Sequence, residues 1–252
     1  KYKSLIDSDS RYFIVTGGRM SGKSFAISSF LLMLTFENDH VILFTRYTMS
    51  SAHISIIPEF ISKIESLELK KHFEITKTEI INKITGSKII FKGIKTSSGI
   101  QTANLKSISG VTSWIIDEAE ELTEEDVFDK IDLSIRTNTN QNRVIVVMNP
   151  STKNHFIYKR FFEDRGVNEC SNLTKGNVTY IHSTFLDNEE NVSKSAIEQI
   201  RHIEVNNPDK YKHIIEGRWL DRAEGVIFTN WSIGEFIEDD TTICGLDFGF
   251  SI

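Results

Sequence analysis

The chain has 252 residues, a length that suffices to bury a complete α/β core in one large or two small domains. Its composition, with 39% hydrophobic and 25% charged residues, is that of a globular protein, and its longest apolar run, residues 25–36, is too short to span a bilayer. The net charge of −6 argues against an evenly basic nucleic-acid-binding surface but leaves room for a local basic face.

Cysteine usage and the first residue set expectations about the cellular context. The two cysteines, Cys170 and Cys244, are too few for a disulfide framework, and no secretory signal opens the chain. We therefore expect a reducing cytoplasm. Because the chain begins with Lys1 rather than methionine, we also expect it to be a piece of a longer polypeptide.

Residues 12–16 are predicted to form a buried strand that leads into a glycine-rich loop with the pattern G-x-x-x-x-G-K-S, and a helix follows from near Phe25. In this context the pattern indicates a phosphate-binding loop, with an ordinary glycine-rich turn as the alternative. Loop N–H groups and the positive end of the helix dipole favour phosphate binding. Lys23 is expected to supply charge to the phosphates, and the Ser24 hydroxyl to be a ligand of Mg²⁺. The predicted nucleotide-binding residues are Gly17, Gly18, Arg19, Met20, Ser21, Gly22, Lys23, Ser24 and Phe25.

The next segments are predicted from their periodicity. Residues 50–69 have the spacing of an amphipathic helix, with Pro58 near its start. The alternating pattern of 73–84 and 88–94 indicates a hairpin on the flank of the sheet. The remaining predictions here are a strand at 41–45 and, at 97–109, a loop with a short helix around 102–106.

Residues 114–116 are predicted to form a short apolar strand that ends at Asp117 and Glu118. In parallel α/β sheets, ligands bind at the carboxyl ends of the strands. Asp117 is therefore expected to hold Mg²⁺ through its water shell, and Glu118 to orient and deprotonate the water that attacks the γ-phosphate. The alternative is a solvated helix face with an acidic first turn. We assign that alternative to the other acidic residues of the segment, Glu120, Glu121, Glu124, Glu125, Asp126, Asp129 and Asp132.

A third continuous apolar strand, residues 143–148, ends at Asn149-Pro150. Two interpretations stay open: Asn149 senses the γ-phosphate or the attacking water, or the dipeptide is a turn that opens a loop. Residues 155–162 are aromatic and basic, which suits either a nucleic-acid-binding face or an amphipathic helix packed on the core. The last predicted elements are a strand at 178–182, helices at 193–204 and 208–216, and a strand at 243–248.

Together these elements predict an α/β fold, that of a P-loop NTPase of the ASCE type with a doubly wound, mainly parallel central sheet. A glutamate directly after the Mg²⁺-associated aspartate favours hydrolysis over phosphoryl transfer to a small molecule. No guanine-reading N-K-x-D motif occurs, so ATP is preferred to GTP.

Six motifs follow one another along the chain: GGRMSGKS at 17–24, WIIDEA at 114–119, MNP at 148–150, STFLDN at 183–188, EGRW at 216–219 and GLDFG at 245–249. In this order they resemble the large terminase subunit of tailed bacteriophages, over essentially the whole chain. The resemblance implies an N-terminal ATPase domain that drives double-stranded DNA into a procapsid. It also implies a C-terminal nuclease domain of ribonuclease-H type that cuts the concatemer with carboxylate-bound metals.

The resemblance implies a domain organisation. Residues 1–220 would be the ATPase domain, with about 153–220 as a helical or linker subdomain packed on it, and 221–252 a linker and the first strand of a truncated nuclease domain. Asp247 matches the first metal-binding aspartate of the nuclease. Because one carboxylate cannot hold two metals, we expect no nuclease activity from this fragment.

The resemblance also implies roles for single residues. Lys23 and Ser24 match the phosphate-loop residues, Asp117 the Mg²⁺ aspartate, Glu118 the catalytic glutamate, and Asn149 lies in the segment that couples hydrolysis to movement. Arg19 matches an arginine inside the loop that neutralises transition-state charge or switches between two states; a solvent-exposed loop residue is the alternative. Met20 stands where the family usually has a small residue, so we expect a stiffer loop. Lys106 lies where some relatives place a trans-acting arginine, and since lysine cannot make the same bidentate contact, that residue is left unassigned.

The implied partners are double-stranded DNA, the portal protein of the procapsid and the small terminase subunit, with a homo-oligomeric ring as the active form, a monomer in isolation, and no membrane. The implied location is the host cytoplasm, transiently at the procapsid portal, and not the mature virion. The alternatives are a helicase-like P-loop translocase of the host and a nucleotide-dependent assembly module with little turnover. Candidate DNA contacts, each also compatible with an ordinary solvated surface, are Lys63, Lys70, Lys71, Lys83, Lys88, Lys92, Lys95, Lys153, Lys159, Arg160 and Arg165.

Overall fold

The computed structural model describes residues 1–48, 56–96, 99–100, 105 and 107–221, all of which belong to the compact unit Lys1–Arg222. The predicted strand at 243–248, most of the predicted helix at 102–106, Lys106 and Asp247 lie outside the described residues. Among the helices of the described part, none combines the length and the apolar character that a membrane-spanning segment requires.

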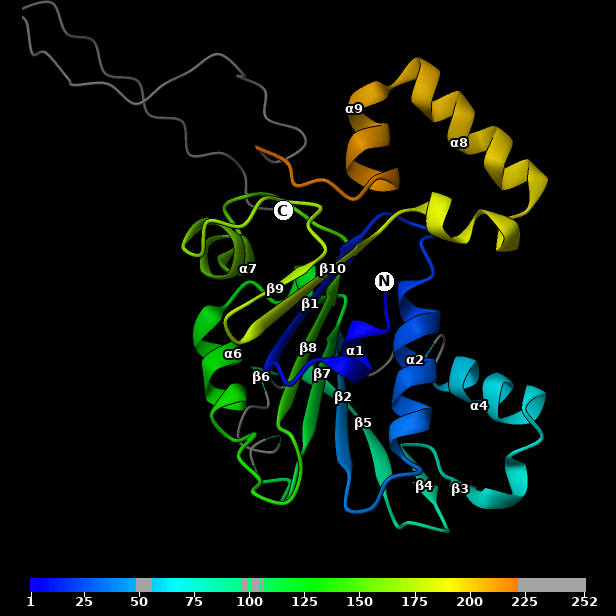
Figure 1. Ribbon diagram of the computed structural model, residues 1–252, viewed down its shortest axis with the longest axis vertical. Coiled ribbons are helices and arrows are strands. Elements are labelled where there is room, and N and C mark those ends of the chain that lie inside the picture. Colours follow the sequence, from blue (N-terminus) through cyan, green and yellow to red (C-terminus); the bar gives the residue numbers. More distant parts are fainter. Residues whose placement is uncertain (49–55, 97–98, 101–104, 106, 222–252) are drawn as a thin grey trace, which may run out of the picture. The chain divides into compact units, whose positions relative to one another are not determined.

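Ten strands form one mixed sheet in the order β3-β4-β5-β2-β7-β8-β1-β10-β9, with β6 paired to β5 (Figure 1). The six central strands are parallel: β5 (Lys88–Thr96), β2 (Val41–Thr48), β7 (Ser113–Asp117), β8 (Arg143–Met148), β1 (Tyr12–Gly17) and β10 (Val178–Ser183). The other four pair antiparallel: β3 (Phe73–Ile75), β4 (Glu79–Asn82), β6 (Gly99–Ile100) and β9 (Leu173–Lys175). The predicted mainly parallel α/β sheet is confirmed.

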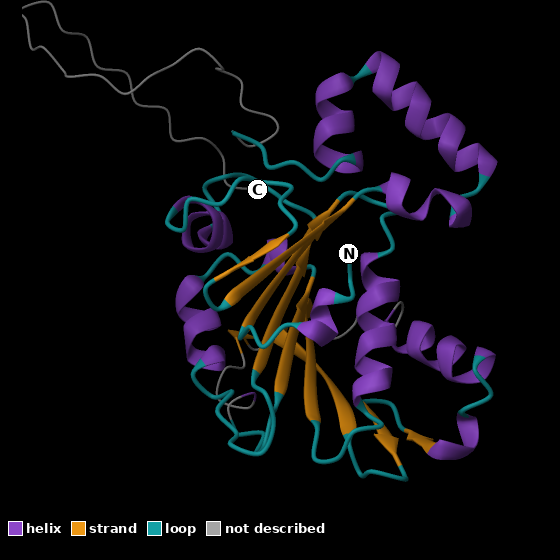
Figure 2. Ribbon diagram, viewed as in Figure 1, coloured by secondary structure: helices purple, strands orange, loops and turns teal. Residues whose placement is uncertain are grey.

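Helices cover both faces of this sheet, as Figure 2 shows. One face packs against α2 (Lys23–Leu34), α4 (Ile57–Ser66) and α1 (Ser4–Asp7), and the other against α6 (Glu125–Asp132) and α7 (Phe156–Tyr158) with the π-helical turn η4 (Lys159–Glu163). Alternate residues of the central strands contribute to the two cores, for example Phe13 to the first and Ile14 to the second. Burial on both faces explains why these strands are continuous apolar runs rather than alternating ones.

The described chain ends in a helical segment after β10. It contains the 3₁₀ helix η5 (Phe185–Asn191), α8 (Lys194–Asn206), α9 (Pro208–Lys210) and the π-helical turn η6 (Tyr211–Ile215). A small separate cluster of Phe185, Ile200 and Ile215 holds these elements together. Two further short 3₁₀ helices of the described part are η2 (Lys70–His72) and η3 (Ala119–Glu121).

Two predicted elements differ in detail from the observed ones, and a third settles an interpretation that the sequence left open. The strand predicted at 73–84 is divided into β3 and β4, because the Thr76 hydroxyl accepts the backbone N–H groups of Thr78 and Glu79 and turns the chain. β5 does not lie on the flank of the sheet but pairs in parallel with β2. The segment 155–162 packs on the core through Phe156, Phe161 and Phe162, which confirms the core-packing interpretation of its aromatic residues.

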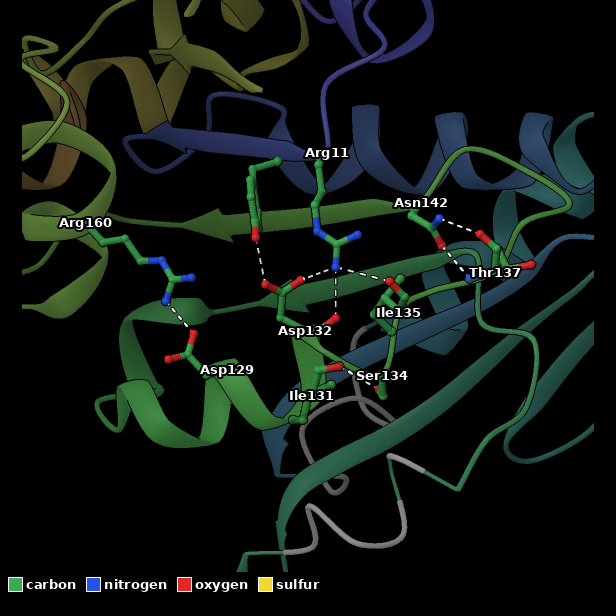
Figure 3. Close-up of polar contacts among 10 residues, drawn as sticks. Arg11, Asp129, Ile131, Asp132, Ser134, Ile135, Thr137, Asn142 and Arg160 are labelled. Carbon is green, nitrogen blue, oxygen red and sulfur yellow. Dashed lines mark hydrogen bonds and ion pairs between the residues drawn. The ribbon is translucent and has the colours of Figure 1, made fainter. Parts of the chain in front are cut away.

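Asp132 is not part of a solvated acidic face, contrary to the prediction. It lies at the end of α6 with 5% of its surface exposed, where its Oδ1 accepts a hydrogen bond of 2.6 Å from Arg11 and its Oδ2 one of 2.7 Å from the Tyr12 hydroxyl. The same Arg11 nitrogen donates to the carbonyl oxygens of Asp132 and Ile135 (Figure 3). This network ties the end of α6 to the start of β1, and a buried carboxylate is tolerated there because both of its oxygens are paired.

Candidate functional site

A cavity of about 530 Å³ opens at the carboxyl ends of β1, β7 and β8. All predicted nucleotide-binding residues except Gly17, together with Asp117, Glu118 and Asn149, line it. The three strand ends are brought together because β7, β8 and β1 are neighbours in the sheet and run parallel. Topology alone therefore unites motifs that lie up to 132 residues apart (149−17).

Glycine is favoured at two positions of the loop for different reasons, a close approach at Gly18 and a left-handed backbone at Gly22. A Cβ atom on Gly18 would lie 1.7 Å from the carbonyl oxygen of Ile215, so the loop packs directly against η6. Gly22 has a φ of 77° and stands immediately before α2, which begins at Lys23 rather than near Phe25. The backbone N–H of Arg19 donates to Ile214, and the Arg19 side chain itself is exposed.

Lys23 is buried in the loop rather than extended into solvent. Its ammonium group donates to the carbonyl oxygens of Gly17 and Gly18 at 2.8 Å each, to Ser21 Oγ at 3.2 Å and to Asn149 Oδ1 at 3.0 Å. Burial lowers the pKa of Lys23 to about 8, against the opposing effect of the nearby carboxylates. A buried ammonium group with this position can exchange its loop partners for an anion in the cavity.

Asp117 and Glu118 share an arginine that the sequence did not point to. Arg46, near the end of β2, donates from Nε and Nη2 to Asp117 Oδ2 at 2.8 and 2.7 Å, and its Nη2 lies 3.2 Å from Glu118 Oε1. Burial raises the pKa of Asp117, and the Arg46 guanidinium opposes that effect. Since β2 and β7 are adjacent parallel strands with Thr45 opposite Ile116, this contact follows from their register.

Glu118 has a left-handed backbone, with φ 55° and ψ 46°, which is unusual for a residue other than glycine. Its side chain is about one-third exposed at the cavity and contacts Arg46. Strained backbone of this kind is concentrated at functional sites, because the surrounding structure must hold it in place.

Glu120 is also a cavity residue, and the prediction that it is solvated was wrong. Its Oε2 accepts the backbone N–H of Asn149 at 3.2 Å, and its Oε1 lies 3.4 Å from the Asn149 amide nitrogen. Burial raises the pKa of Glu120 to about 7. The left-handed turn at Glu118 causes this difference, because it turns the following 3₁₀ helix back toward the end of β8.

Asn149 was given two interpretations from the sequence, a sensor of phosphate or water and a turn. The structure places its side chain between Lys23 and Glu120 in the cavity. Ser24 and Phe25 line the same cavity, and Phe25 is 65% exposed with the Lys63 ammonium 3.5 Å from its ring centroid. Lys63 is itself buried and paired with Glu59, so the proposal that it contacts DNA from the surface is corrected.

One further cavity residue comes from a distant part of the chain. Asn188, in η5, donates from its amide nitrogen to the carbonyl oxygen of Met20 at 3.0 Å. Met20 has a φ of 61°, a left-handed conformation that this contact helps to hold. Asn188 belongs to the STFLDN motif, but its contact with the loop depends on the pairing of β10 with β1 and was not predicted.

The oxygen donors of the cavity suit a hard cation such as Mg²⁺. The Ser24 hydroxyl and the Asp117 carboxylate both line it, and Mg²⁺ is typically bound by one or two such groups together with substrate phosphates and water. Among the described residues, no group of three or more His, Cys, Asp or Glu side chains forms a metal site by itself. Ser24 and Asp117 fit a site that substrate phosphates and water complete.

Comparison with known proteins identifies the family. A model of the phage terminase large subunit family matches residues 9–218. The large terminase subunit of Bacillus phage SPP1 is 26% identical in an alignment 257 positions long, which covers 94% of this chain and 57% of that protein. This chain thus spans little more than half the length of that relative.

Solved structures show the same fold. The large terminase of a thermophilic bacteriophage, solved in complex with ADP, has a TM-score of 0.63 at 17% identity, covering 84% of this chain and 49% of that one. The ATPase domain of the large terminase of Thermus phage P74-26 has a TM-score of 0.61 at 16% identity, covering 86% of this chain and 92% of that domain. The chain therefore belongs to the phage terminase large subunit family and has the fold of its ATPase domain.

Proposed function

We propose that residues 1–220 form an ATPase domain that hydrolyses ATP with Mg²⁺ to drive double-stranded DNA into a procapsid. The observation that supports this most strongly is the meeting of Lys23, Asp117 and Glu118 at one cavity in a chain of this family. The preference for ATP is supported by the large terminase of the thermophilic bacteriophage, which was solved with ADP and with ATP-γ-S.

Lys23 and the loop N–H groups bind the phosphates in this proposal. The ammonium group of Lys23 leaves the carbonyl oxygens of Gly17 and Gly18 for the β- and γ-phosphates, where its charge is better compensated. Arg19, exposed at the rim of the cavity, supplies a second positive charge as the transition state forms. Ser24 and Asp117 would hold Mg²⁺, which supplies Lewis-acid neutralisation of phosphate charge when bound.

Glu118 acts as the general base. It accepts a proton from the attacking water while the water oxygen bonds to the γ-phosphorus and the bond from that phosphorus to the β–γ bridging oxygen breaks, so that ADP leaves. Arg46 pairs with the Glu118 carboxylate and so holds it at the cavity before the water binds. Asn149, directly after β8, accepts a hydrogen bond from the Lys23 ammonium. When Lys23 turns to the phosphates this bond is lost, so the end of β8 responds to a bound nucleotide.

The activity of the whole protein requires more than the described residues. Since the chain covers 57% of the SPP1 large terminase, we propose that residues 221–252 lead into the nuclease domain, whose first metal aspartate is Asp247. The proposed partners are DNA, the portal protein, the small terminase subunit and further copies of the chain in a ring, which assemble in the host cytoplasm. DNA binding through phosphates should be insensitive to sequence and fall steeply with salt.

A Glu118→Gln variant tests the proposal. Turnover should fall by about 10³-fold because the base is lost, while binding of a fluorescent ATP analogue stays within about twofold. Glu121→Gln is the matched control, since Glu121 is exposed and does not line the cavity. Its turnover should equal that of the parent. Turnover that survives in Glu118→Gln would show instead a binding module or a different base.

A further inference from the structure

The Glu120 carboxylate contacts Asn149 twice, through the backbone and through the side chain. Oε2 accepts the backbone N–H at 3.2 Å, and Oε1 faces the side-chain nitrogen at 3.4 Å. The two bonds fix both the end of β8 and the rotamer of the side chain that follows it. No other residue of η3 does this: Ala119 is buried in the core, and Glu121 is exposed.

The chemistry of the two neighbours determines which way the amide of Asn149 faces. The pKa of Glu120 is about 7 and that of Lys23 about 8, so between these pH values the carboxylate is mostly ionised and only accepts hydrogen bonds, while the lysine ammonium only donates them. Glu120 therefore requires the Nδ2 of Asn149, and Lys23, 3.0 Å away on the other side, requires the Oδ1. If the amide were turned around, two donors would face each other at Lys23 and two acceptors at Glu120.

We propose that Glu120 is a positioning residue that holds the Asn149 amide with its carbonyl oxygen toward Lys23 and the cavity. This inference rests on the proposed function. Asn149 then acts only as an acceptor in the cavity: its Oδ1 takes a hydrogen bond from Lys23 before the nucleotide binds, and from the attacking water once Lys23 has turned to the phosphates. A phosphate oxygen, which is an acceptor, is not its partner.

An exchange of the carboxylate and the amide tests this pair directly. Asn149→Asp places a second carboxylate against Glu120 and should lower kcat by more than about tenfold, because like charges at this distance repel. Glu120→Gln leaves the Asn149 amide without its fixed acceptor and should lower kcat by about tenfold with KM changed by less than about threefold. Glu120→Gln should bind the nucleotide analogue like the parent, whereas Asn149→Asp, which adds a negative charge beside Lys23, should bind it more weakly.

The double variant Glu120→Gln with Asn149→Asp restores the pattern of donors and acceptors. The Gln oxygen accepts the backbone N–H, the Gln nitrogen donates to the new aspartate, and the other oxygen of that aspartate faces Lys23; the net charge is unchanged. We expect kcat to return to within about threefold of the parent, which is strong positive coupling between the two sites. Glu121→Gln combined with Asn149→Asp is the control and should show no recovery.

The outcomes separate this inference from the proposed function. Losses that add in the double variant, or single variants with unchanged kcat, would overturn the role of Glu120. If the urea midpoint recovers in the double variant but kcat does not, the pair is merely structural and the positioning role is also overturned. If Glu120→Gln alone fails to fold, the kcat of Asn149→Asp is compared with that of the double variant. Recovery in the double variant then supports the role of Glu120, and no recovery overturns it. Parent protein without turnover, alone and extended past Ile252, would contradict the proposed function and this inference with it.

Discussion

Two arginine–aspartate pairs, each with a buried carboxylate, serve the same sheet in different ways. Asp132 and Arg11 lie where α6 meets the start of β1, and both carboxylate oxygens are bonded to groups of that strand and its preceding residue. Asp117 and Arg46 lie at the carboxyl end of β7, where Arg46 contacts one oxygen twice and both residues line the cavity. The first pair lies away from the cavity, with Asp132 buried and the Arg11 side chain 30% exposed, and it fastens a helix to the sheet. The second borders open space, so its charges remain available to a substrate.

The largest expected effect is a loss of ATP turnover when a cavity residue is removed. Lys23→Ala removes the ammonium group that bridges the loop and Asn149, and ATP turnover should fall by about 10³-fold because phosphate charge loses its compensation. Steady-state ATPase assays measure this loss of turnover. Lys71→Ala, a change at an exposed lysine, is the control. A variant that keeps a tenth of the parent activity would contradict the role of Lys23.

The Asp132–Arg11 pair, which lies away from the cavity, should affect stability instead. Asp132→Ala leaves Arg11 and the Tyr12 hydroxyl without their shared partner, and the free energy of unfolding should fall by about 3 kcal/mol. Urea denaturation measures the change, with Asp126→Ala at an exposed position of the same helix as the control. Turnover per folded molecule should not change. A selective loss of turnover at full stability would mean that the two pairs are not separate.

The motifs themselves and the ends of the strands could be predicted from the sequence, because each lies within one short segment. Arg46 could not be, since its contact with Asp117 depends on the register of two strands 71 residues apart. Glu120 and Glu121 look alike in sequence, and only the left-handed turn at Glu118 separates a cavity residue from a solvated one. Asn188 reaches the loop only because β10 lies beside β1.

The stability of the fold should depend on pH through His182, which lies beside the end of β1. Burial lowers the pKa of His182, whose Nδ1 lies 3.0 Å from Thr16 Oγ1, from its ordinary 6.5 to about 4. The unfolded chain therefore takes up the proton first as pH falls, so the stability from this group is complete above pH 6.5 and is lost toward pH 4. Between about pH 7 and about pH 5 the free energy of unfolding should fall by about 2 kcal/mol from this residue.

Denaturant unfolding at several pH values measures this loss. In His182→Gln, which cannot take up a proton, the curve of stability against pH should be flatter than the parent curve by that amount. Parallel curves for the two proteins would show that His182 is protonated in the folded state as easily as in the unfolded one.

The smallest expected effect is on turnover, when the shape of the Arg46 side chain beside Asp117 is changed. Arg46→Lys keeps the charge but cannot reach Asp117 and Glu118 with a planar fork, so turnover should fall by about tenfold, with stability nearly unchanged. Single-turnover kinetics would place the loss in the chemical step. Full activity would show that a point charge is enough at this position.

The central claim is that a triphosphate is bound by the glycine loop while Glu118 activates water next to its terminal phosphate. A crystal structure with a non-hydrolysable ATP analogue and Mg²⁺ tests it most directly. We predict that Lys23 Nζ will contact the phosphates and that a water will lie between the γ-phosphate and the Glu118 carboxylate. A nucleotide bound elsewhere, or a terminal phosphate beyond the reach of Glu118, would contradict the account.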